Sequence, residues 1–531
     1  MNAIKSILPF VFILSVIQFS AQDLTVVPRP NSVHWGEGSF SLSSAVTIRA
    51  DKALKNELRH LSNFLQKGFG EKPRENKRGG IRLKIDQTLA EKNEEGYQLE
   101  VSQNGIVIKG ASPTGVFYGI QTFRQLLPPE FESDDKSTAV DLPSVTITDE
   151  PRFPWRAFML DESRHFKGKE TVKKLLDQMA YLKMNTFHWH LTDDQGWRIE
   201  IKKYPKLTEI GSFRTDTQAE RKSELRTGEP HSGHYTQDDI KEIIAYAKER
   251  HINIVPEIEM PGHAMAAVAA YHWLGTLRTT KEVPVTFGKM DDSFDVTDPK
   301  VVSFLKDVLD EVMNLFPGQV VHIGGDEVNF EPWLQNEHMV EYMEAKHMKS
   351  PMDLQISFTN EISNYIDKAG KRMMGWNEIL GHQVHEDRGT SGTVSEKLAP
   401  SAIVHFWKGD LSLVHKAVEE GYEVVNSNHW DTYLDYTYQR LPLEKSYAFD
   451  PVPEGLKPEY HSQILGLGTQ MWSEWIPTVE SMERQIFPRL AAYAEVGWTE
   501  GEHKDYQAFQ NALEGVQYTW GQNGIHYHQE E

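Results

Sequence analysis

The sequence predicts an α/β fold: a (β/α)8 TIM barrel preceded by a small α+β domain. Two observations predict it. From Trp155 onward, eight short β-rich runs alternate with amphipathic helical stretches, and polar or aromatic side chains recur where the runs end. The preceding residues instead contain a hairpin and an amphipathic helix. We therefore expect a signal peptide at 1–21, the α+β domain at 22–150 and the barrel at 151–531.

The first segment has the layout of a cleaved signal peptide. Lys5 precedes an apolar run at 7–19, and the small residues Ser20 and Ala21 follow it. The run is short for a bilayer span and lacks a basic stop-transfer flank. We expect cleavage near Ala21 and an exported protein, periplasmic or extracellular, with no membrane span after cleavage.

The composition limits the chemistry that the chain can support. Its 531 residues include 77 acidic and 56 basic ones, for a net charge of −21. This balance argues against nucleic acid or anionic membranes as partners, because both require basic patches. The absence of cysteine excludes disulfides, thiolate nucleophiles and cysteine-bound zinc.

The segment 22–150 contains a clear hairpin. Residues 97–110 alternate between apolar and polar on both sides of Asn104 and Gly105, a pair that favours a tight turn. A helix should follow and end at Pro128. Its apolar face carries Val116, Phe117, Ile120, Phe123 and Leu127.

Eight runs and their intervening helices predict the barrel. A capping-box pattern at 236–239 marks the start of one helix. A doubly wound open sheet is the alternative, and a nucleotide-binding version would need a Gly-rich phosphate turn, which the sequence lacks. The runs begin near Ala157, Asn185, Ile252, Val320, Arg372, Ala402, Tyr422 and Ile464.

A barrel places its chemistry at the carboxyl ends of its strands. The ends of the predicted strands deliver carboxylates, histidines and tryptophans in almost every case, which indicates a site on that face. In chain order they are LDESRH, HWHLTDD, PEIEMPGH, HIGGDE, GWNE, HFW, SNHWDTYLD and TQMWSE.

Asp326 and Glu327 are the strongest candidates for acid–base chemistry. They follow an apolar strand and Gly324-Gly325, where burial and mutual repulsion favour keeping one proton. Glycosidases need two carboxyls on either side of a sugar, about 5–9.5 Å apart, and adjacent residues do not straddle a ring comfortably. A substrate 2-acetamido group could instead attack C1 and form an oxazolinium-like intermediate. Glu327 would then protonate the leaving oxygen, while Asp326 orients the acetamido N–H.

Other strand-end residues suit a sugar pocket. Trp376, Trp407 and Trp472 could form its apolar walls, and Arg164 has the forked donors that match two vicinal hydroxyls. Polar groups of the kind that hold sugar hydroxyls are supplied by Tyr433, Asp435 and Glu474.

The histidines raise a rival hypothesis. His188 and His190 point to the same side of a strand, and with His263 they could bind a metal, as in barrel hydrolases. In those enzymes the pair ends the first strand, whereas here it lies on the second. We therefore favour interior barrel positions for His188 and His190, a hydrogen bond from His263 to a carboxylate, and no metal or other cofactor.

These motifs, in this order, resemble glycoside hydrolase family 20, the β-N-acetylhexosaminidases, from about residue 25 to the C-terminus. The resemblance implies an exo-acting, retaining enzyme that hydrolyses terminal non-reducing β-linked GlcNAc or GalNAc in oligosaccharides or glycoconjugates. It assigns general acid/base chemistry to Glu327 and acetamide orientation to Asp326. The resemblance also implies that Tyr433 binds the acetamido oxygen, that Arg164 binds the O3 and O4 hydroxyls, and that Asp435 and Glu474 lie near O4 and O6. Trp376, Trp407 and Trp472 would form the pocket walls. Asp193 and His263 would form a relay that positions Glu327.

One position departs from the family pattern, and several properties stay open. Glu259 stands where the family often has aspartate before Met-Pro-Gly-His. GlcNAc and GalNAc both fit the pattern, as do chitin fragments, glycoprotein glycans and peptidoglycan fragments. A non-catalytic sugar-binding protein on the same scaffold would need a missing acid, and both acids are present. The oligomeric state and the role of the polar segment 212–234 are not assigned.

Overall fold

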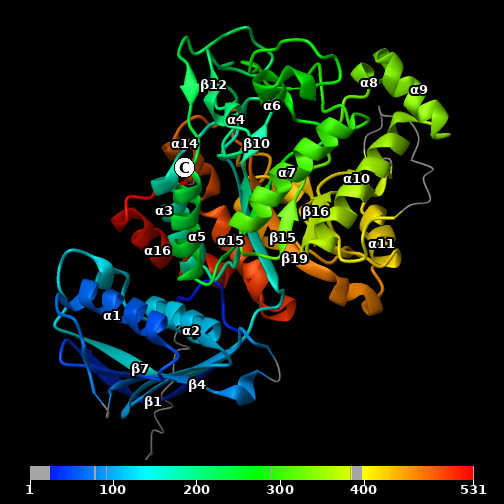
Figure 1. Ribbon diagram of the computed structural model, residues 1–531. Helices are drawn as coiled ribbons and strands as arrows, with labels where there is room; N and C mark the ends of the chain where they lie inside the picture. The colour runs from blue at the N-terminus through cyan, green and yellow to red at the C-terminus, as the bar shows by residue number, and fades with distance from the viewer. Residues whose placement is uncertain are drawn as a thin grey trace, which may run out of the picture.

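The computed structural model describes residues 24–76, 79–90, 93–288, 290–382, 384 and 397–529. The expected signal peptide lies outside these residues. The chain forms a small sheet with two helices, blue and cyan in Figure 1, and a larger barrel. In the described residues, no helix combines the length and apolar character needed to cross a bilayer.

The small part is a seven-stranded mixed sheet. The predicted hairpin is confirmed, since β5 and β6 pair antiparallel across Asn104. The helices α1 (Lys55–Phe69) and α2 (Pro113–Leu126) lie on the side of the sheet that faces the barrel (Figure 1). The strands, in their order across the sheet, are β1 (Ser32–Ser43), β7 (Ala139–Asp149), β5 (Tyr97–Ser102), β6 (Gly105–Gly110), β4 (Ile81–Ile85), β2 (Thr47–Ala50) and β3 (Arg74–Glu75).

The rest of the chain is built around a closed parallel barrel, which confirms the predicted fold. Its last strand pairs with its first, so the alternative of an open sheet is wrong. Each predicted β-rich run corresponds to one strand. They are β8 (Trp155–Asp161), β9 (Thr186–His190), β14 (Asn253–Glu257), β15 (Val320–His322), β16 (Arg372–Trp376), β17 (Ile403–Phe406), β18 (Glu423–Asn426) and β19 (Ile464–Met471).

Helices cover the outside of the barrel. The predicted capping box is present: the Thr236 side chain accepts from the Asp239 backbone N–H at the start of α5. The longer helices are α3 (Lys169–Tyr181), α5 (Gln237–Lys248), α7 (Pro299–Leu315), α10 (Pro351–Lys368), α15 (Arg489–Trp498) and α16 (Tyr506–Gln522). The shorter ones are α4 (Lys206–Glu209), α6 (Met265–Ala270), α8 (Glu331–Gln335), α9 (Glu337–Ala345), α11 (Ser412–Glu419), α12 (His429–Thr432), α13 (Leu443–Ala448) and α14 (Val479–Ile486).

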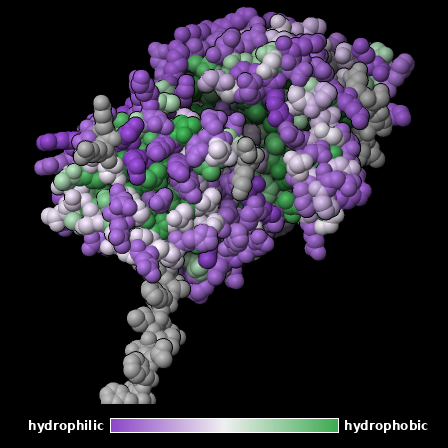
Figure 2. Space-filling view, turned by 90° about the horizontal axis from the view of Figure 1, so that it is seen from below, coloured by the Kyte–Doolittle hydropathy of each residue, from purple (hydrophilic) through white to green (hydrophobic). Residues whose placement is uncertain are grey.

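Buried ion pairs join the small sheet to the barrel. Arg156, near the start of β8, donates from Nη1 and Nη2 to the two carboxylate oxygens of Glu95, at 2.9 and 3.0 Å. Lys183, just before β9, lies 3.4 Å from the Asp149 carboxylate at the end of β7. The sheet therefore supports the barrel at the amino ends of its strands, away from the predicted chemistry. The face seen in Figure 2 is hydrophilic over most of its outline, as the net charge of −21 leads us to expect.

Candidate active site

The turn after β15 carries the two adjacent acids in an unusual backbone conformation. Gly324, Gly325 and Glu327 have φ values of +65°, +92° and +48°, in the left-handed region that a non-glycine residue seldom adopts. A Cβ on Gly324 would overlap the Glu259 carboxylate, so this position also requires a close approach. The backbone N–H of Trp376 donates to the Gly324 carbonyl at 2.8 Å and ties the turn to the next strand.

Asp326 is buried beside a histidine. Its Oδ2 lies 3.7 Å from Nε2 of His263, and its Oδ1 accepts no hydrogen bond from the described residues. Burial raises the pKa of Asp326 to about 8; the positive charge of His263 opposes this rise, and the charges of Glu378 and Glu327 add to it. The resulting site has a carboxyl group with an open oxygen and a histidine behind it. The ring of His263 thus lies beside Asp326, and the relay from Asp193 and His263 to Glu327 stays a prediction.

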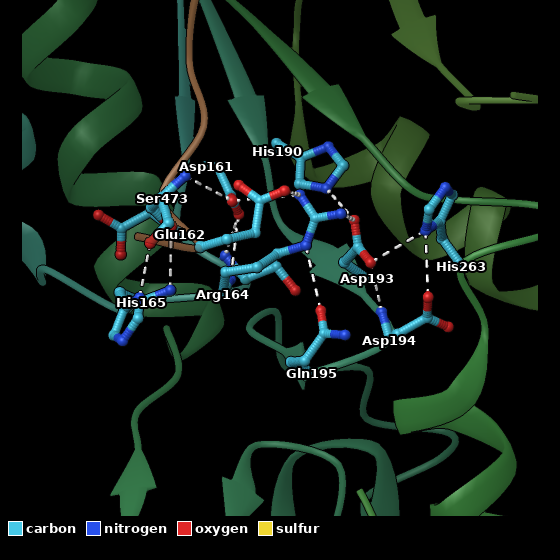
Figure 3. A network of polar contacts seen from close by, with 12 residues as sticks. Asp161, Glu162, Arg164, His165, His190, Asp193, Asp194, Gln195, His263 and Ser473 are labelled. Carbon is cyan, nitrogen blue, oxygen red and sulfur yellow. Dashed lines mark hydrogen bonds and ion pairs between the residues drawn. The ribbon is translucent and has the colours of Figure 1, made fainter. Parts of the chain in front are cut away.

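Asp193 holds His263 from the other side (Figure 3). Nδ1 of His263 lies 3.2 Å from Oδ1 of Asp193 and 3.1 Å from Oδ2 of Asp194. Burial alone would lower the pKa of His263, but the Asp193 charge and these hydrogen bonds raise it well above its ordinary value. The predicted hydrogen bond from His263 to a carboxylate is confirmed, and the imidazolium form is favoured.

Arg164 is already held by protein groups. Its Nη2 lies 2.7 Å from Asp193, Nη1 is 3.2 Å from Asp161, and Nε donates to Gln195 at 3.1 Å. Nη1 is also 3.8 Å from Glu474, and the guanidinium lies 5.1 Å from the ring centroid of Trp472. Figure 3 shows this network around the arginine. The structure therefore fixes the fork beside Trp472 and Glu474, two of the residues that the sequence assigns to the same pocket.

The predicted aromatic walls come together. Trp376 lies 6.5 Å from Trp407 and 6.1 Å from Trp472, between ring centroids. Tyr433 is nearly parallel to Trp407 at 6.2 Å and lies 6.1 Å from Trp472. These four rings come from the ends of β16, β17, β18 and β19, so the barrel gathers residues that are almost 100 positions apart in the chain.

Asp435 and Glu474 are acids that follow two of these rings, Tyr433 and Trp472, in the chain. Burial raises the pKa of Asp435 to about 7, and the charge of Glu474 adds to this rise. Burial also raises the pKa of Glu474, although Arg164 opposes it. The Oδ1 atom of Asp435 has no hydrogen-bond partner among the described residues, which leaves it open to a ligand hydroxyl.

His188 and His190 occupy buried positions in the barrel, as predicted, and share one carboxylate. Glu257 lies 2.9 Å from His188, 2.7 Å from His190 and 2.9 Å from His322. It also accepts from Nε1 of Trp376 at 2.9 Å. The sequence analysis did not assign this central role to Glu257, and the available signal was its position in the strand-end motif PEIEMPGH.

The three histidines of the rival metal hypothesis do not form one ligand set. In the part of the chain that the structure describes, the groups with metal-compatible spacing are His188 with Glu257 and His322, His190 with Asp193 and Glu259, and His263 with Asp193 and Asp194. Each histidine thus belongs to a different group, and the ring nitrogens of His190 and Nδ1 of His263 already make hydrogen bonds within the protein.

The polar segment 212–234 contacts the site. Its ends form a short antiparallel pair, β12 (Phe213–Arg214) and β13 (His231–Ser232). The guanidinium of Arg214 donates to the backbone carbonyls of Arg164 and Gln195, at 2.6 and 3.1 Å. Arg214 therefore supports the loops that carry the arginine network, a role that the sequence did not indicate.

A bound sugar ring needs apolar faces for its C–H surface and a proton donor beside its glycosidic bond. The parallel barrel supplies both at one end of its strands, and this combination defines a glycoside hydrolase. The chain belongs to glycosyl hydrolase family 20: residues 153–501 match the catalytic domain of that family, and residues 23–150 match its domain 2.

Relatives and solved structures agree with this family. The chain is 37% identical over 527 residues to a beta-hexosaminidase of Porphyromonas gingivalis, covering 95% of this chain and 64% of that protein. It is 33% identical to a beta-hexosaminidase of Vibrio furnissii, covering 90% of this chain and 77% of the relative. The chain thus spans less than two thirds of the Porphyromonas protein.

Two solved structures have similar folds. One is an exo beta-N-acetylglucosaminidase from Vibrio harveyi in complex with N-acetylglucosamine, with a TM-score of 0.82, 30% identity and coverage of 96% of this chain and 79% of that one. The other is a Streptomyces plicatus N-acetyl-beta-hexosaminidase in complex with Thio-NAglucal, with a TM-score of 0.81, 30% identity and coverage of 96% and 97%.

Proposed function

We propose that the protein is an exo-acting, retaining β-N-acetylhexosaminidase that releases terminal non-reducing β-linked GlcNAc or GalNAc. The observation that carries this proposal is the placement of Asp326 and Glu327 on one tight turn, with Asp326 buried against His263. Two adjacent carboxyls do not take the opposed positions of an ordinary glycosidase pair. The substrate's own acetamido group supplies the nucleophile. Two relatives are beta-hexosaminidases and one solved structure is an exo beta-N-acetylglucosaminidase, which supports the same substrate class.

The proposed reaction proceeds in two displacements. Glu327 gives its proton to the glycosidic oxygen while the acetamido carbonyl oxygen attacks C1, which releases the leaving alcohol and forms an oxazolinium ion. Asp326 accepts the acetamido N–H, and the Tyr433 hydroxyl donates to the acetamido oxygen. Water then attacks C1 and gives a proton to Glu327, so the acetamide is regenerated and the β configuration is retained. The positive charge of the intermediate favours the ionised form of Asp326.

The test is the requirement for the 2-acetamido group. We expect the purified protein to hydrolyse an aryl β-GlcNAc faster than the matching aryl β-glucoside by on the order of 10³-fold in kcat/KM, because intramolecular attack replaces a bimolecular step. Equal rates on the two glycosides would refute substrate assistance. Glu327→Gln should abolish hydrolysis while GlcNAc binding persists in calorimetry, which separates the chemical step from recognition.

We also propose that the protein is exported, on the basis of Lys5, the apolar run at 7–19 and Ser20-Ala21. N-terminal sequencing of the protein from the periplasm or the culture medium should find a chain that begins close to residue 22. A cytoplasmic protein that retains its first residues would contradict this proposal.

A further inference from the structure

Cations from three segments gather around exposed aromatic rings beside the candidate pocket. Tyr436 lies 5.9 Å from Tyr433, between ring centroids, so it continues the pocket wall outward. The Arg440 guanidinium lies 3.8 Å from the Tyr436 ring centroid and 4.5 Å from that of Trp430, whose surface is 52% exposed. We call Arg221, Lys408, Arg440 and Lys445 the basic rim.

Arg440 is a preformed anion receptor by its geometry. Stacking on aromatic faces uses the flat side of a guanidinium and leaves its N–H donors, which lie in the plane, unused. Arg440 is exposed, and its side chain makes no hydrogen bond or ion pair with any residue that the structure describes. The two rings thus hold a charged fork in place with donors available for a carboxylate or sulfate.

Two lysines add charge at the same place. Nζ of Lys408 lies 5.2 Å from the ring centroid of Trp407. Nζ of Lys445 donates to the Trp430 carbonyl at 2.7 Å and lies 3.2 Å from Asp431, which offsets part of its charge. The pKa of His429 is lowered to about 4, first by burial and then by the charges of Lys408, Arg440 and Lys445. All three cations therefore act on the same histidine.

Arg221 approaches from the segment 212–234. It is exposed, and its positive charge opposes the upward pKa shifts of both Asp435 and Tyr436. The segment therefore contributes a positive charge that acts on both of these side chains. The chain as a whole has a net charge of −21, so the basic rim is a local positive patch on an acidic protein.

We propose that the basic rim binds a carboxylate or sulfate on the leaving part of the substrate, so that the enzyme prefers acidic aglycones. This inference rests on the proposed function and names its substrate class. The aglycone is the part that fits, because the pocket itself ends in the acids Asp435 and Glu474, which would repel an anionic group on the bound GlcNAc. The rim adjoins the rings of the pocket, since Tyr436 lies 5.9 Å from Tyr433 and Nζ of Lys408 lies 5.2 Å from the Trp407 ring centroid, and we place the leaving sugar against it.

The experiment compares a neutral disaccharide with one whose reducing-end sugar carries an added acidic group. One is N,N'-diacetylchitobiose, and the other carries a 3-O-lactyl carboxylate on its reducing-end sugar. We expect kcat/KM for the acidic disaccharide, divided by that for the neutral one, to fall about threefold to tenfold in Arg440→Gln and in Arg221→Gln. In Arg440→Lys this ratio should fall less, because lysine keeps the positive charge but lacks the forked donors of the guanidinium. The matched control is Arg484→Gln, an exposed arginine of α14 paired with Glu480 at 3.0 Å, which should not change the ratio.

Each outcome decides the proposal. A ratio that is unchanged in both Arg440→Gln and Arg221→Gln overturns it. A 6-O-sulfated GlcNAc glycoside with a neutral aglycone is the third substrate: if these variants affect it more than the acidic disaccharide, the anion belongs to the bound sugar and the aglycone assignment is wrong. If Arg440→Gln does not fold, Arg221→Gln carries the test from a separate segment. Failure of the wild type to cleave either disaccharide would instead refute the proposed function.

Discussion

Nη2 of Arg164 lies 2.7 Å from Oδ2 of Asp193, whose other oxygen lies 3.2 Å from Nδ1 of His263. One carboxylate thus connects the arginine beside Trp472 and Glu474 with the histidine behind Asp326 (Figure 3). Burial would raise the pKa of Asp193, but the charges of Arg164 and His263 lower it well below its ordinary value. In the proposed reaction, hydroxyl recognition and acid–base chemistry would therefore depend on the same buried charge.

Asp193→Asn tests this connection. The amide is nearly isosteric but carries no charge, so Arg164 loses an ion pair and His263 loses the anion that keeps it protonated. We expect kcat/KM on an aryl β-GlcNAc to fall by about 10²–10³, with kcat reduced more than KM is raised. Asp194→Asn removes a carboxylate that contacts His263 but not Arg164, so it should lower kcat/KM less than Asp193→Asn does. Equal losses in the two variants would contradict the central role of Asp193.

Glu257→Gln should destabilise the barrel. Burial would raise the pKa of Glu257, but the neighbouring histidines lower it well below its ordinary value, while the Glu257 and Asp193 partners raise the pKa of His190 to about 10. Removing the anion leaves a buried imidazolium with one partner fewer. We expect the free energy of unfolding in urea to fall by about 3–5 kcal/mol. Glu423→Gln, which removes a half-exposed ion pair with Arg372, should cost less than about 1 kcal/mol.

Gly324→Ala should affect both stability and activity. The new Cβ would enter the space of the Glu259 carboxylate at a backbone angle that alanine adopts with strain. We expect a loss of about 2–4 kcal/mol in unfolding free energy, together with loss of hydrolysis because the turn carries Asp326 and Glu327. Gly421→Ala is the matched control: φ is +96° and a Cβ there would contact nothing, so only about 1 kcal/mol of backbone strain is expected. Similar losses of unfolding free energy in Gly324→Ala and Gly421→Ala would show that the contact with Glu259 is unimportant.

The pH dependence of stability should include a contribution from Glu495. Burial raises the pKa of this carboxyl to about 7 from an ordinary value of 4.5, although it accepts from the Arg29 N–H and the Tyr447 hydroxyl. The folded state thus keeps a proton that the unfolded chain releases above pH 4.5. Its stabilising effect is complete below that pH and is lost as the pH rises through 7, by up to about 3 kcal/mol.

Glu495→Gln checks this sign, because the amide does not ionise. Between pH 5 and pH 8, the unfolding free energy of the variant in urea should rise relative to that of the wild type. Glu480→Gln, an exposed acid of α14, should show no such trend. Parallel pH profiles for the wild type and Glu495→Gln would contradict the prediction.

Local patterns were sufficient to predict much of the fold. The hairpin about Asn104, the capping box at Thr236 and all eight barrel strands were predictable because each depends on residues that are near neighbours in the chain. The position of the site followed as well, since parallel strands of a barrel end on the same face. This rule placed Trp376, Trp407 and Trp472 together before any distance was known.

The sequence by itself determined the barrel, the face that carries the chemistry and the residue types gathered there, because periodicity and strand ends are local properties. Only the tertiary structure decided which of these residues touch. Glu257 binds three histidines from two strands, His188 and His190 of β9 and His322 of β15, and Arg214 supports the loop of Arg164. Such contacts depend on how strands and loops far apart in the chain are brought side by side, and on the charges and pKa values that burial then produces.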